Sequence, residues 1–342
     1  MAFFINTIKQ KARDFFASQL TPLQADIEKT NQLARASHHQ TMQALQLIAA
    51  HISPDLRDQL PAIGTVDSLL DGKMVIVPHY ERLLRPDDVF LVSYPRSGNT
   101  WLRAICAYLL YPAQTMQTLK DLDEYVPDLY VKLPTHDRYS TPRVFKSHEP
   151  YATRHGHHNT ALYQKYIYVL RHPFKVIESY YHFETNVSRR GLPDLDTFLD
   201  MVLNNAFDYG GWGEHVTSWQ YAQKYAQSVL FLRYEDVQKH PIAYIQRTGR
   251  FLGVVVDDAQ AEQVRIHSSQ ESMRELDNKG AIIPGFEMVR AGEQRQLATK
   301  LTDAMKEAIY TRYQAVMDAW GYAPDGTVAD EYPLKATFAD KG

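Results

Sequence analysis

The sequence predicts an α/β protein: a parallel sheet flanked by helices, with a strand–loop–helix unit suited to phosphate binding and a helical extension at the N-terminus. Short apolar runs alternate with helical patterns along the chain, and a glycine-bearing turn joins one such run to a helix. This alternation is typical of parallel sheets covered on both faces. The first seventy or so residues lack β-branched runs and carry no glycine before Gly64, which favours helices.

Four short apolar runs are the expected strands of the sheet. They lie at residues 89–93, 144–146, 166–170 and 229–232. Three of them are followed by helical patterns, at residues 100–110, 174–185 and 243–252. Because a helix after each strand returns the chain to the same end of the sheet, these strands are expected to run parallel.

Three segments are predicted along the chain. Residues 1–72 form a helical extension, residues 73–322 form the main domain, and residues 323–342 form a loosely held tail. The extension carries an apolar helical stripe from Leu23 to Ile52. This stripe is expected to pack on its own domain, with self-association into a homo-oligomer as the alternative.

The composition excludes several functional classes. The net charge of −3 over 342 residues gives no basic surface for nucleic acid. Cys106 is the single cysteine, so there is neither a disulfide framework nor a cysteine-based zinc site. No segment approaches the roughly 18 apolar residues of a membrane span. We therefore expect a soluble, cytoplasmic protein that is not bound to a membrane.

The turn after the first strand has the features of an anion cradle. Residues 94–101 read YPRSGNTW and lead directly into a helix. A turn of this kind aims backbone N–H groups at an anion, and the helix adds its positive end. Arg96 supplies a charge that persists at any working pH. The side chains of Ser97, Asn99 and Thr100 are further candidate donors, and Gly98 allows the backbone to turn.

This turn differs from the nucleoside-triphosphatase P-loop. That motif needs a first glycine and a Gly-Lys-Ser/Thr end, and neither the first glycine nor the lysine is in place here. No suitable magnesium-binding carboxylate follows a later strand. Two alternatives stay open: a P-loop phosphotransferase or kinase, which would depend on magnesium, and a non-catalytic nucleotide-binding or scaffold protein.

The loop resembles that of the sulfotransferases that use 3′-phosphoadenosine 5′-phosphosulfate (PAPS), and the resemblance continues in order down the chain. The family's other motifs resemble residues 144–150 (VFKSHEP), 166–181 (YIYVLRHPFKVIESYY), 209–216 (YGGWGEHV), 232–241 (LRYEDVQKHP) and 290–292 (RAG). The resemblance implies an α/β sulfotransferase that takes PAPS as donor and releases 3′,5′-adenosine bisphosphate (PAP). It implies no metal.

Three residues have catalytic roles by this resemblance. His148, at the end of an expected strand, matches the family's catalytic histidine, and an ordinary histidine pKa of about 6.5 suits a general base near neutrality. Lys146 lies two residues away on the same face of that strand. Arg96 matches the lysine that contacts the leaving phosphate, and the arginine keeps its charge with a larger, planar group.

The resemblance also assigns the donor's phosphate and adenine contacts. Arg171 and Ser179 match ligands of the 3′-phosphate. Arg290 and Gly292 are expected to close over that phosphate, with Ala291 in place of the family's lysine. The remaining matches belong to the adenine site: Trp101, Tyr234, and the pair Ser268 and Ser269, with Gln270 in place of a stacking phenylalanine.

The acceptor pocket is expected to lie among variable loops. These loops cover residues 113–140, 182–215 and 275–288, and their aromatic residues are Tyr125, Tyr130, Tyr139, Tyr209 and Trp212. An aromatic lining favours a small-molecule acceptor, an alcohol or a phenol, with an amine as the open alternative. The histidines at 155, 157 and 158 are expected to lie in an exposed loop and not in a zinc site.

Overall fold

The computed structural model describes residues 65–70, 73–77, 84–129, 142–152, 154–155, 158–188, 194–289 and 301–330. The predicted helical extension up to residue 64, with its Leu23–Ile52 stripe, lies outside these residues. So do Tyr130 and Tyr139 of the expected acceptor pocket, and Arg290, Ala291 and Gly292 of the expected phosphate closure.

A four-stranded parallel sheet with the order β4-β3-β7-β8 organises the fold. Its strands are β3 (Val89–Ser93), β4 (Val144–Ser147), β7 (Lys165–Leu170) and β8 (Ser228–Arg233). In register, Val92 lies beside Ser147 and Ser93 beside Val169. The carboxyl ends of the strands therefore meet at one edge. The predicted α/β class with a parallel sheet is confirmed.

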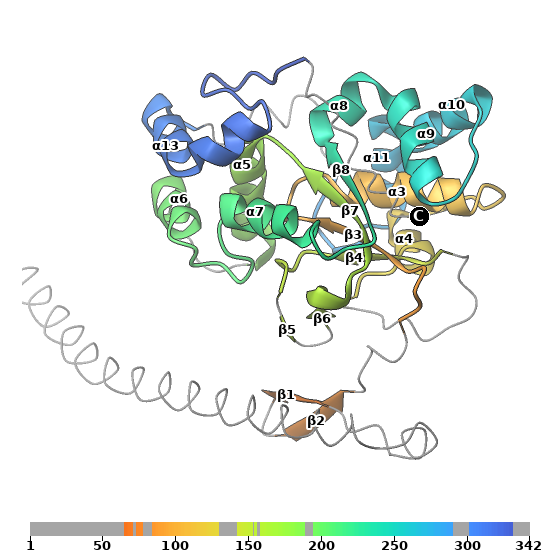
Figure 1. Ribbon diagram of the computed structural model, residues 1–342, viewed down its shortest axis with the longest axis horizontal. Helices are drawn as coiled ribbons and strands as arrows, with labels where there is room; N and C mark the ends of the chain where they lie inside the picture. Colours follow the sequence, from red (N-terminus) through yellow and green to blue (C-terminus); the bar gives the residue numbers. More distant parts are fainter. Residues whose placement is uncertain are drawn as a thin grey trace, which may run out of the picture. The chain divides into compact units, whose positions relative to one another are not determined.

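Helices occupy both sides of this sheet (Figure 1). The α-helices are α3 (Asn99–Leu110), α4 (Leu122–Tyr125), α5 (Pro173–Phe183), α6 (Leu195–Leu203), α7 (Trp212–Ala222), α8 (Tyr234–Lys239), α9 (Pro241–Phe251), α10 (Asp258–His267), α11 (Gln270–Lys279) and α13 (Asp303–Ala319). The short helices are η2 (Leu119–Asp121), η3 (Thr160–Leu162) and the π-helix η4 (Glu184–Ser188). Two small hairpins pair β1 (Thr65–Leu70) with β2 (Lys73–Val77), and β5 (Arg154–His155) with β6 (His158–Asn159).

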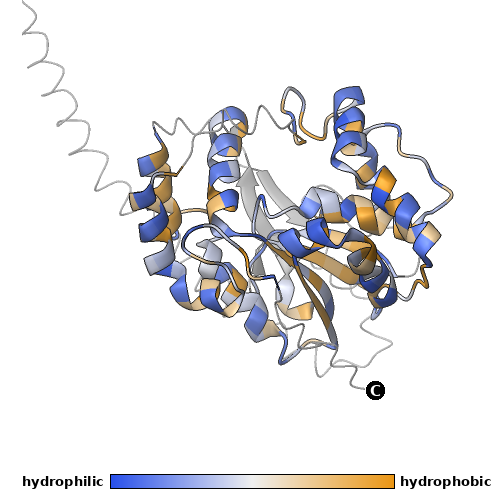
Figure 2. Ribbon diagram, turned by 90° about the horizontal axis from the view of Figure 1, so that it is seen from above, coloured by the Kyte–Doolittle hydropathy of each residue, from blue (hydrophilic) through white to orange (hydrophobic). Residues whose placement is uncertain are grey.

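Alternate residues of the strands feed two separate hydrophobic cores. Phe90 and Val92 of β3 belong to the core that includes residues of α5, α6, α7 and α13, whereas Val89 and Leu91 belong to the core formed with α3, α9, α10 and α11. Along these helices hydrophilic and hydrophobic colours alternate in Figure 2. Each strand is thus buried on both faces, which explains why the strands read as continuous apolar runs.

Local sequence sets the start of several helices. Pro173 and Pro241 occupy the first turns of α5 and α9, where a missing N–H costs nothing. Asp257 and Gln260 form a capping box at the start of α10. Thr302 caps α13 by accepting a hydrogen bond from Met305 N at 3.3 Å.

The prediction that residues 1–72 are helical is wrong for Thr65–Leu70, which form β1. This strand pairs antiparallel with β2, and Leu70 lies opposite Lys73. The intervening residues are Asp-Gly, a dipeptide typical of tight hairpin turns. The hairpin signal therefore outweighed the helical trend of the preceding sequence.

The prediction of a loose tail after Tyr322 is wrong for residues 323–330. Arg233, at the end of β8, donates from Nη1 to Trp320 O and from Nη2 to Ala329 O, both at 3.0 Å. Ala329 N donates to Gly321 O at 2.8 Å. A buried arginine at the end of β8 thus holds two points of the segment, because its guanidinium donates to carbonyls of Trp320 and Ala329. Residues 331–342 lie outside the described part of the chain.

We predict that Arg233→Ala lowers the free energy of unfolding by about 3–5 kcal/mol. Its guanidinium makes a bidentate pair with Asp236, at 2.7 and 2.6 Å, and only 1% of the Arg233 side chain is exposed. Removing it leaves a carboxylate and two carbonyls without their partner. Chemical denaturation measures the change.

Lys239→Ala is the matched control, since Lys239 also ties the segment down, through Asp330. Both of those side chains are largely exposed, and exposed pairs contribute little. Equal losses for the two variants would contradict the assignment of the anchor to Arg233.

Candidate active site

The predicted anion cradle has the backbone geometry that anion binding requires. Gly98 precedes α3 with φ of 101°, and Arg96 has φ of 67°. Within the described residues no side chain caps α3, and its first turn has no acidic residue. The first N–H groups of this 12-residue helix are thus left for an anion.

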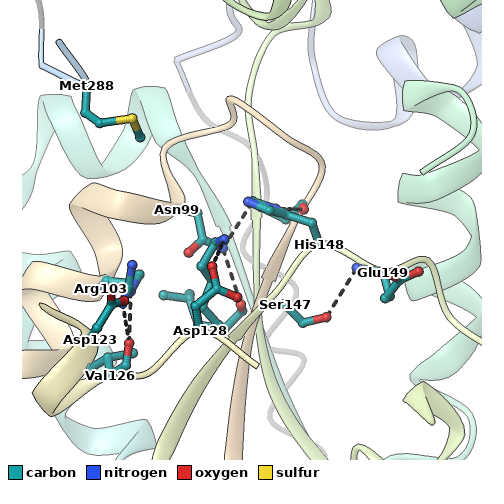
Figure 3. A network of polar contacts seen from close by, with 12 residues as sticks. Asn99, Arg103, Asp123, Val126, Asp128, Ser147, His148, Glu149 and Met288 are labelled. Atoms are coloured by element: carbon teal, nitrogen blue, oxygen red, sulfur yellow. Dashed lines mark hydrogen bonds and ion pairs between the residues drawn. The ribbon is translucent and has the colours of Figure 1, made fainter. Parts of the chain in front are cut away.

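Asn99 is oriented differently from the sequence prediction. Its Nδ2 donates to Leu91 O at 3.3 Å and to Ser93 Oγ at 3.2 Å, so the side-chain amide points back into β3 (Figure 3). The Ser97 side chain is fully buried as well. These two residues therefore offer the cradle their backbone, while their side chains shape the loop from beneath.

Glycine at position 98 is needed for space as well as for conformation. A Cβ at this position would lie 2.5 Å from the ring of Tyr234. That ring lies 5.1 Å from the ring of Trp101 and 4.4 Å from the Arg171 guanidinium carbon. Trp101 Nε1 donates to Ser268 O at 2.8 Å. Four predicted donor-site segments thus meet around one tyrosine.

Arg171 and Ser179 are also brought to the loop. Arg171 Nη1 donates to Arg96 O at 3.3 Å, and Arg96 Nε donates to Ser179 Oγ at 3.2 Å. The Arg96 guanidinium lies 5.2 and 5.8 Å from the ring centroids of Phe183 and Phe286, within cation–π range. The side chain predicted to face the leaving phosphate is therefore engaged by Ser179 and by two aromatic rings.

Ser268 and Ser269 use their hydroxyls locally. Ser268 Oγ donates to Val264 O at 2.7 Å, and Ser269 Oγ caps α11 by accepting from Ser272 N at 3.2 Å. Gln270 is the exposed first residue of that helix. Of this predicted adenine-site group, the Ser268 carbonyl makes the contact with Trp101.

His148 follows β4 and reaches the end of β3. Its Nδ1 lies 2.8 Å from Ser93 O. A carbonyl only accepts, so Nδ1 carries the proton and Nε2 keeps its lone pair. Burial and, next, the positive charge of Lys146 hold the pKa of His148 well below 6.5. At neutral pH the imidazole is therefore uncharged and able to accept a proton.

A second histidine, His215 of α7, supports His148 from behind. Its Nε2 donates to His148 O at 2.9 Å, and its Nδ1 accepts from Tyr168 OH at 2.8 Å. Burial lowers the pKa of His215 to about 4, which keeps it neutral. Sequence reasoning gave His215 no role, although it lies within the motif YGGWGEHV.

Lys146 forms an ion pair with Asp128, a residue that sequence reasoning also missed. Asp128 follows α4, and nothing in its local sequence marks it as a partner of a lysine 18 residues later. About 15% of each side chain is exposed. The pair places a carboxylate next to two of the predicted catalytic residues.

The predicted aromatic acceptor lining is only partly assembled. The Tyr209 ring lies 5.9 Å from the His148 ring. Tyr125 packs on Tyr111 at 5.1 Å. The expectation for Trp212 is wrong, because its side chain is fully buried in the core, 5.6 Å from the ring of Tyr313. The side chains of the predicted histidine cluster lie outside the described residues.

Among the described residues, no group of three or more His, Cys, Asp or Glu side chains is placed to hold a metal ion. No helix among them is long and apolar enough to cross a membrane.

A parallel α/β domain, with an anion cradle at the strand ends and a neutral histidine beside it, suits an enzyme that transfers a group. The sequence model described as "Sulfotransferase domain" matches residues 86–321. The chain belongs to the sulfotransferase family, and it is a sulfotransferase enzyme.

Similar proteins agree with this assignment. Sulfotransferase 4A1 of Homo sapiens is 33% identical over 208 residues, which cover 58% of this chain and 70% of that protein. Sulfotransferase 1B1 of Canis lupus familiaris is 30% identical over 203 residues, covering 56% of this chain and 67% of that protein. The crystal structure of retinol dehydratase in complex with androsterone and inactive cofactor PAP has a TM-score of 0.55 at 20% identity, covering 70% of this chain and 83% of that one. This last likeness shows the shared fold.

We predict that Gly98→Ala weakens PAP binding by more than tenfold. A left-handed backbone costs an alanine roughly 1–2 kcal/mol, and the new Cβ also displaces the Tyr234 ring on which Arg171 lies. Calorimetric titration with PAP measures the loss.

Gly253→Ala is the control, because Gly253 has φ of 76° and nothing within 4 Å of an added Cβ. It carries the same backbone strain without the clash and is expected to keep PAP affinity. Unchanged affinity in Gly98→Ala would show that the contact with Tyr234 does not shape the site.

Proposed function

We propose that this chain transfers the sulfuryl group of PAPS to a hydroxyl group of a small organic acceptor. One observation carries the proposal: Arg171 and Ser179, expected at the donor's 3′-phosphate, both contact Arg96 of the 94–98 turn. Two anion-binding positions are therefore adjacent, as a nucleotide phosphorylated at both its 3′ and 5′ positions requires.

The donor site fits such a nucleotide in three respects. The free N–H groups at the start of α3 suit the 5′ end, and Arg171 with the Ser179 hydroxyl suits the 3′-phosphate. Trp101 and Tyr234 offer aromatic surface for the adenine. When bound, PAPS supplies an activated sulfuryl group on its 5′-phosphate. In the proposed arrangement the residues of the chain position the donor and the acceptor and supply positive charge.

His148 is the proposed general base. Its Nε2 takes the proton of the acceptor hydroxyl while the acceptor oxygen forms a bond to sulfur and the bond from sulfur to the 5′-phosphate oxygen breaks. The products are a sulfate ester and PAP, and His148 later gives its proton to solvent. Lys146 provides positive charge beside the reacting oxygens. His215 keeps His148 in place through the His148 carbonyl.

A small hydroxyl-bearing acceptor is proposed because aromatic side chains border the base. Tyr209 lies beside His148, and the rings of Phe183 and Phe286, which contact each other edge to face, lie beside Arg96. The retinol dehydratase structure contains androsterone. A panel of phenols, alcohols and amines with PAPS, read by the mass of the sulfated product, tests the acceptor class. A product from amines alone would replace the hydroxyl proposal.

We predict that His148→Ala lowers turnover by about 10²–10⁴-fold, the usual contribution of a general base, while PAP affinity stays nearly unchanged. PAP affinity is the internal control for folding. Turnover equal to wild type would exclude His148 as the base.

The pH profile checks the same role. A base acts when it is neutral, and the pKa of His148 lies well below 6.5, so wild-type kcat is expected to hold constant from neutrality to below pH 6.5. A fall of kcat centred at pH 6.5 or above would contradict this.

We predict that the protein binds PAP at least tenfold more tightly than AMP without magnesium. Charge-assisted hydrogen bonds contribute roughly 1.5–3 kcal/mol each, and only PAP offers a 3′-phosphate to Arg171. Arg171→Ala is expected to remove most of the difference. Calorimetry in a chelator measures both nucleotides. Equal affinities in wild type, or a strict need for magnesium, would favour a phosphotransferase instead.

A further inference from the structure

We propose that Asp128 is a positioning residue for the catalytic pair Lys146 and His148. The Asp128 carboxylate contacts Lys146 Nζ directly, and neither side chain is more than 15% exposed. This inference rests on the proposed sulfuryl transfer and adds to it a residue that contacts neither the donor nor the acceptor in the proposal. Asp128 belongs to the network of polar contacts drawn in Figure 3, together with Asn99 and His148.

The backbone around Asp128 is fixed on the side of α3. Arg103, with 2% of its side chain exposed, donates to Val126 O from Nε at 3.0 Å and from Nη2 at 2.6 Å. The same Nη2 pairs with Asp123 at 2.6 Å. The helix that begins at the anion cradle therefore also holds the segment that carries Asp128.

The segment is fixed on the side of β4 as well. Lys146 N donates to Pro127 O at 2.9 Å, and Leu129 N donates to Lys146 O at 3.2 Å. Asp128 and Lys146 thus form a parallel bridge alongside β4. Because the two backbones are joined, the carboxylate reaches the ammonium group with little further loss of conformational freedom. A chance surface ion pair has no such support.

The carboxylate favours the protonated form of both of its neighbours, and it contacts only Lys146 directly. Burial is the main cause that lowers the pKa of Lys146, and the charge of Arg103 acts in the same direction. Asp128, and more weakly Asp123, oppose this and favour the ammonium form. For His148, burial, Lys146 and His215 lower the pKa, whereas Asp128 and the Ser93 carbonyl raise it. Asp128 therefore favours the ammonium form of Lys146, while burial and the charge of Lys146 favour the neutral form of His148.

Asp128→Asn is the direct test, in the full-length enzyme with PAPS and an acceptor from the panel. Without the carboxylate, the pKa values of Lys146 and His148 both fall. Turnover needs neutral His148, whose titration sets the acid limb of the kcat profile, and charged Lys146, whose titration sets the alkaline limb. Both limbs are therefore expected to shift to lower pH, by about 1 unit or more. We expect kcat at neutral pH to fall by about 10–100-fold, and PAP affinity to change much less.

Two further variants separate positioning from mere structure. Asp128→Glu retains the charge and is expected to restore part of kcat and the wild-type limbs. If Asp128→Asn does not fold, Asp128→Glu serves as the test, because the limbs of its kcat profile must then match those of the wild type. Asp123→Asn is the matched control: Asp123 lies in the same segment, is 19% exposed and pairs with Arg103. Its limbs are expected to move less than those of Asp128→Asn.

The outcomes distinguish this inference from the proposed function. Lower kcat with unmoved limbs in Asp128→Asn would assign Asp128 a structural role and overturn the inference. Wild-type kcat in Asp128→Asn would also overturn it. So would a kcat profile whose limbs stay in place in Asp128→Asn and shift in Asp123→Asn. A wild-type protein that binds no PAP and sulfates no acceptor would instead overturn the proposed function.

Discussion

The site depends on the parallel pairing of β3 with β4 on one side and β7 on the other. Parallel strands carry their carboxyl ends to the same edge, and the register sets Val92 beside Ser147 and Ser93 beside Val169 there. His148 can reach the Ser93 carbonyl only because β3 and β4 end together. The same alignment brings Arg171, just after β7, to the carbonyl of Arg96. A shift of one residue in either pairing would separate these contacts and turn the strand faces toward the opposite cores.

The electrostatics of the site follow from its burial. An ammonium group and an imidazole lie close together where little water reaches them, so they compete for a single positive charge. Burial disfavours charge on both. The Asp128 carboxylate gives the lysine the advantage, and the Ser93 carbonyl fixes which imidazole nitrogen carries a proton. Burial, one carboxylate and one carbonyl thus act together on the protonation of the pair.

The sequence predicted the strands and the glycine turn before α3, because each depends on local order: apolar runs and a turn residue. Several residues expected at the donor site are brought together in the structure, and their role stays a prediction. The sequence did not predict Asp128, His215 or the direction of Arg96, since these depend on which side chains meet across the sheet. The prediction for Trp212 was wrong because the sequence alone does not distinguish an aromatic residue of a hydrophobic core from one that lines a pocket. The tail was misread because its anchor, Arg233, lies about ninety residues earlier in the chain. The Thr65–Leu70 strand was misread because its pairing partner, Lys73–Val77, comes only after the segment that was predicted to be helical.

The anchoring of residues 320–330 has a consequence for the order in which the protein can mature on the ribosome. Arg233 meets partners that lie 87 and 96 residues further along the chain. At about 5–20 residues per second, these partners are synthesised roughly 5–20 s after the arginine. During that interval β8 ends in a guanidinium group whose carbonyl partners do not yet exist, and Glu235 lacks the hydroxyl of Tyr322. The nascent domain is therefore exposed to chaperones and proteases until residues 320–330 have been released.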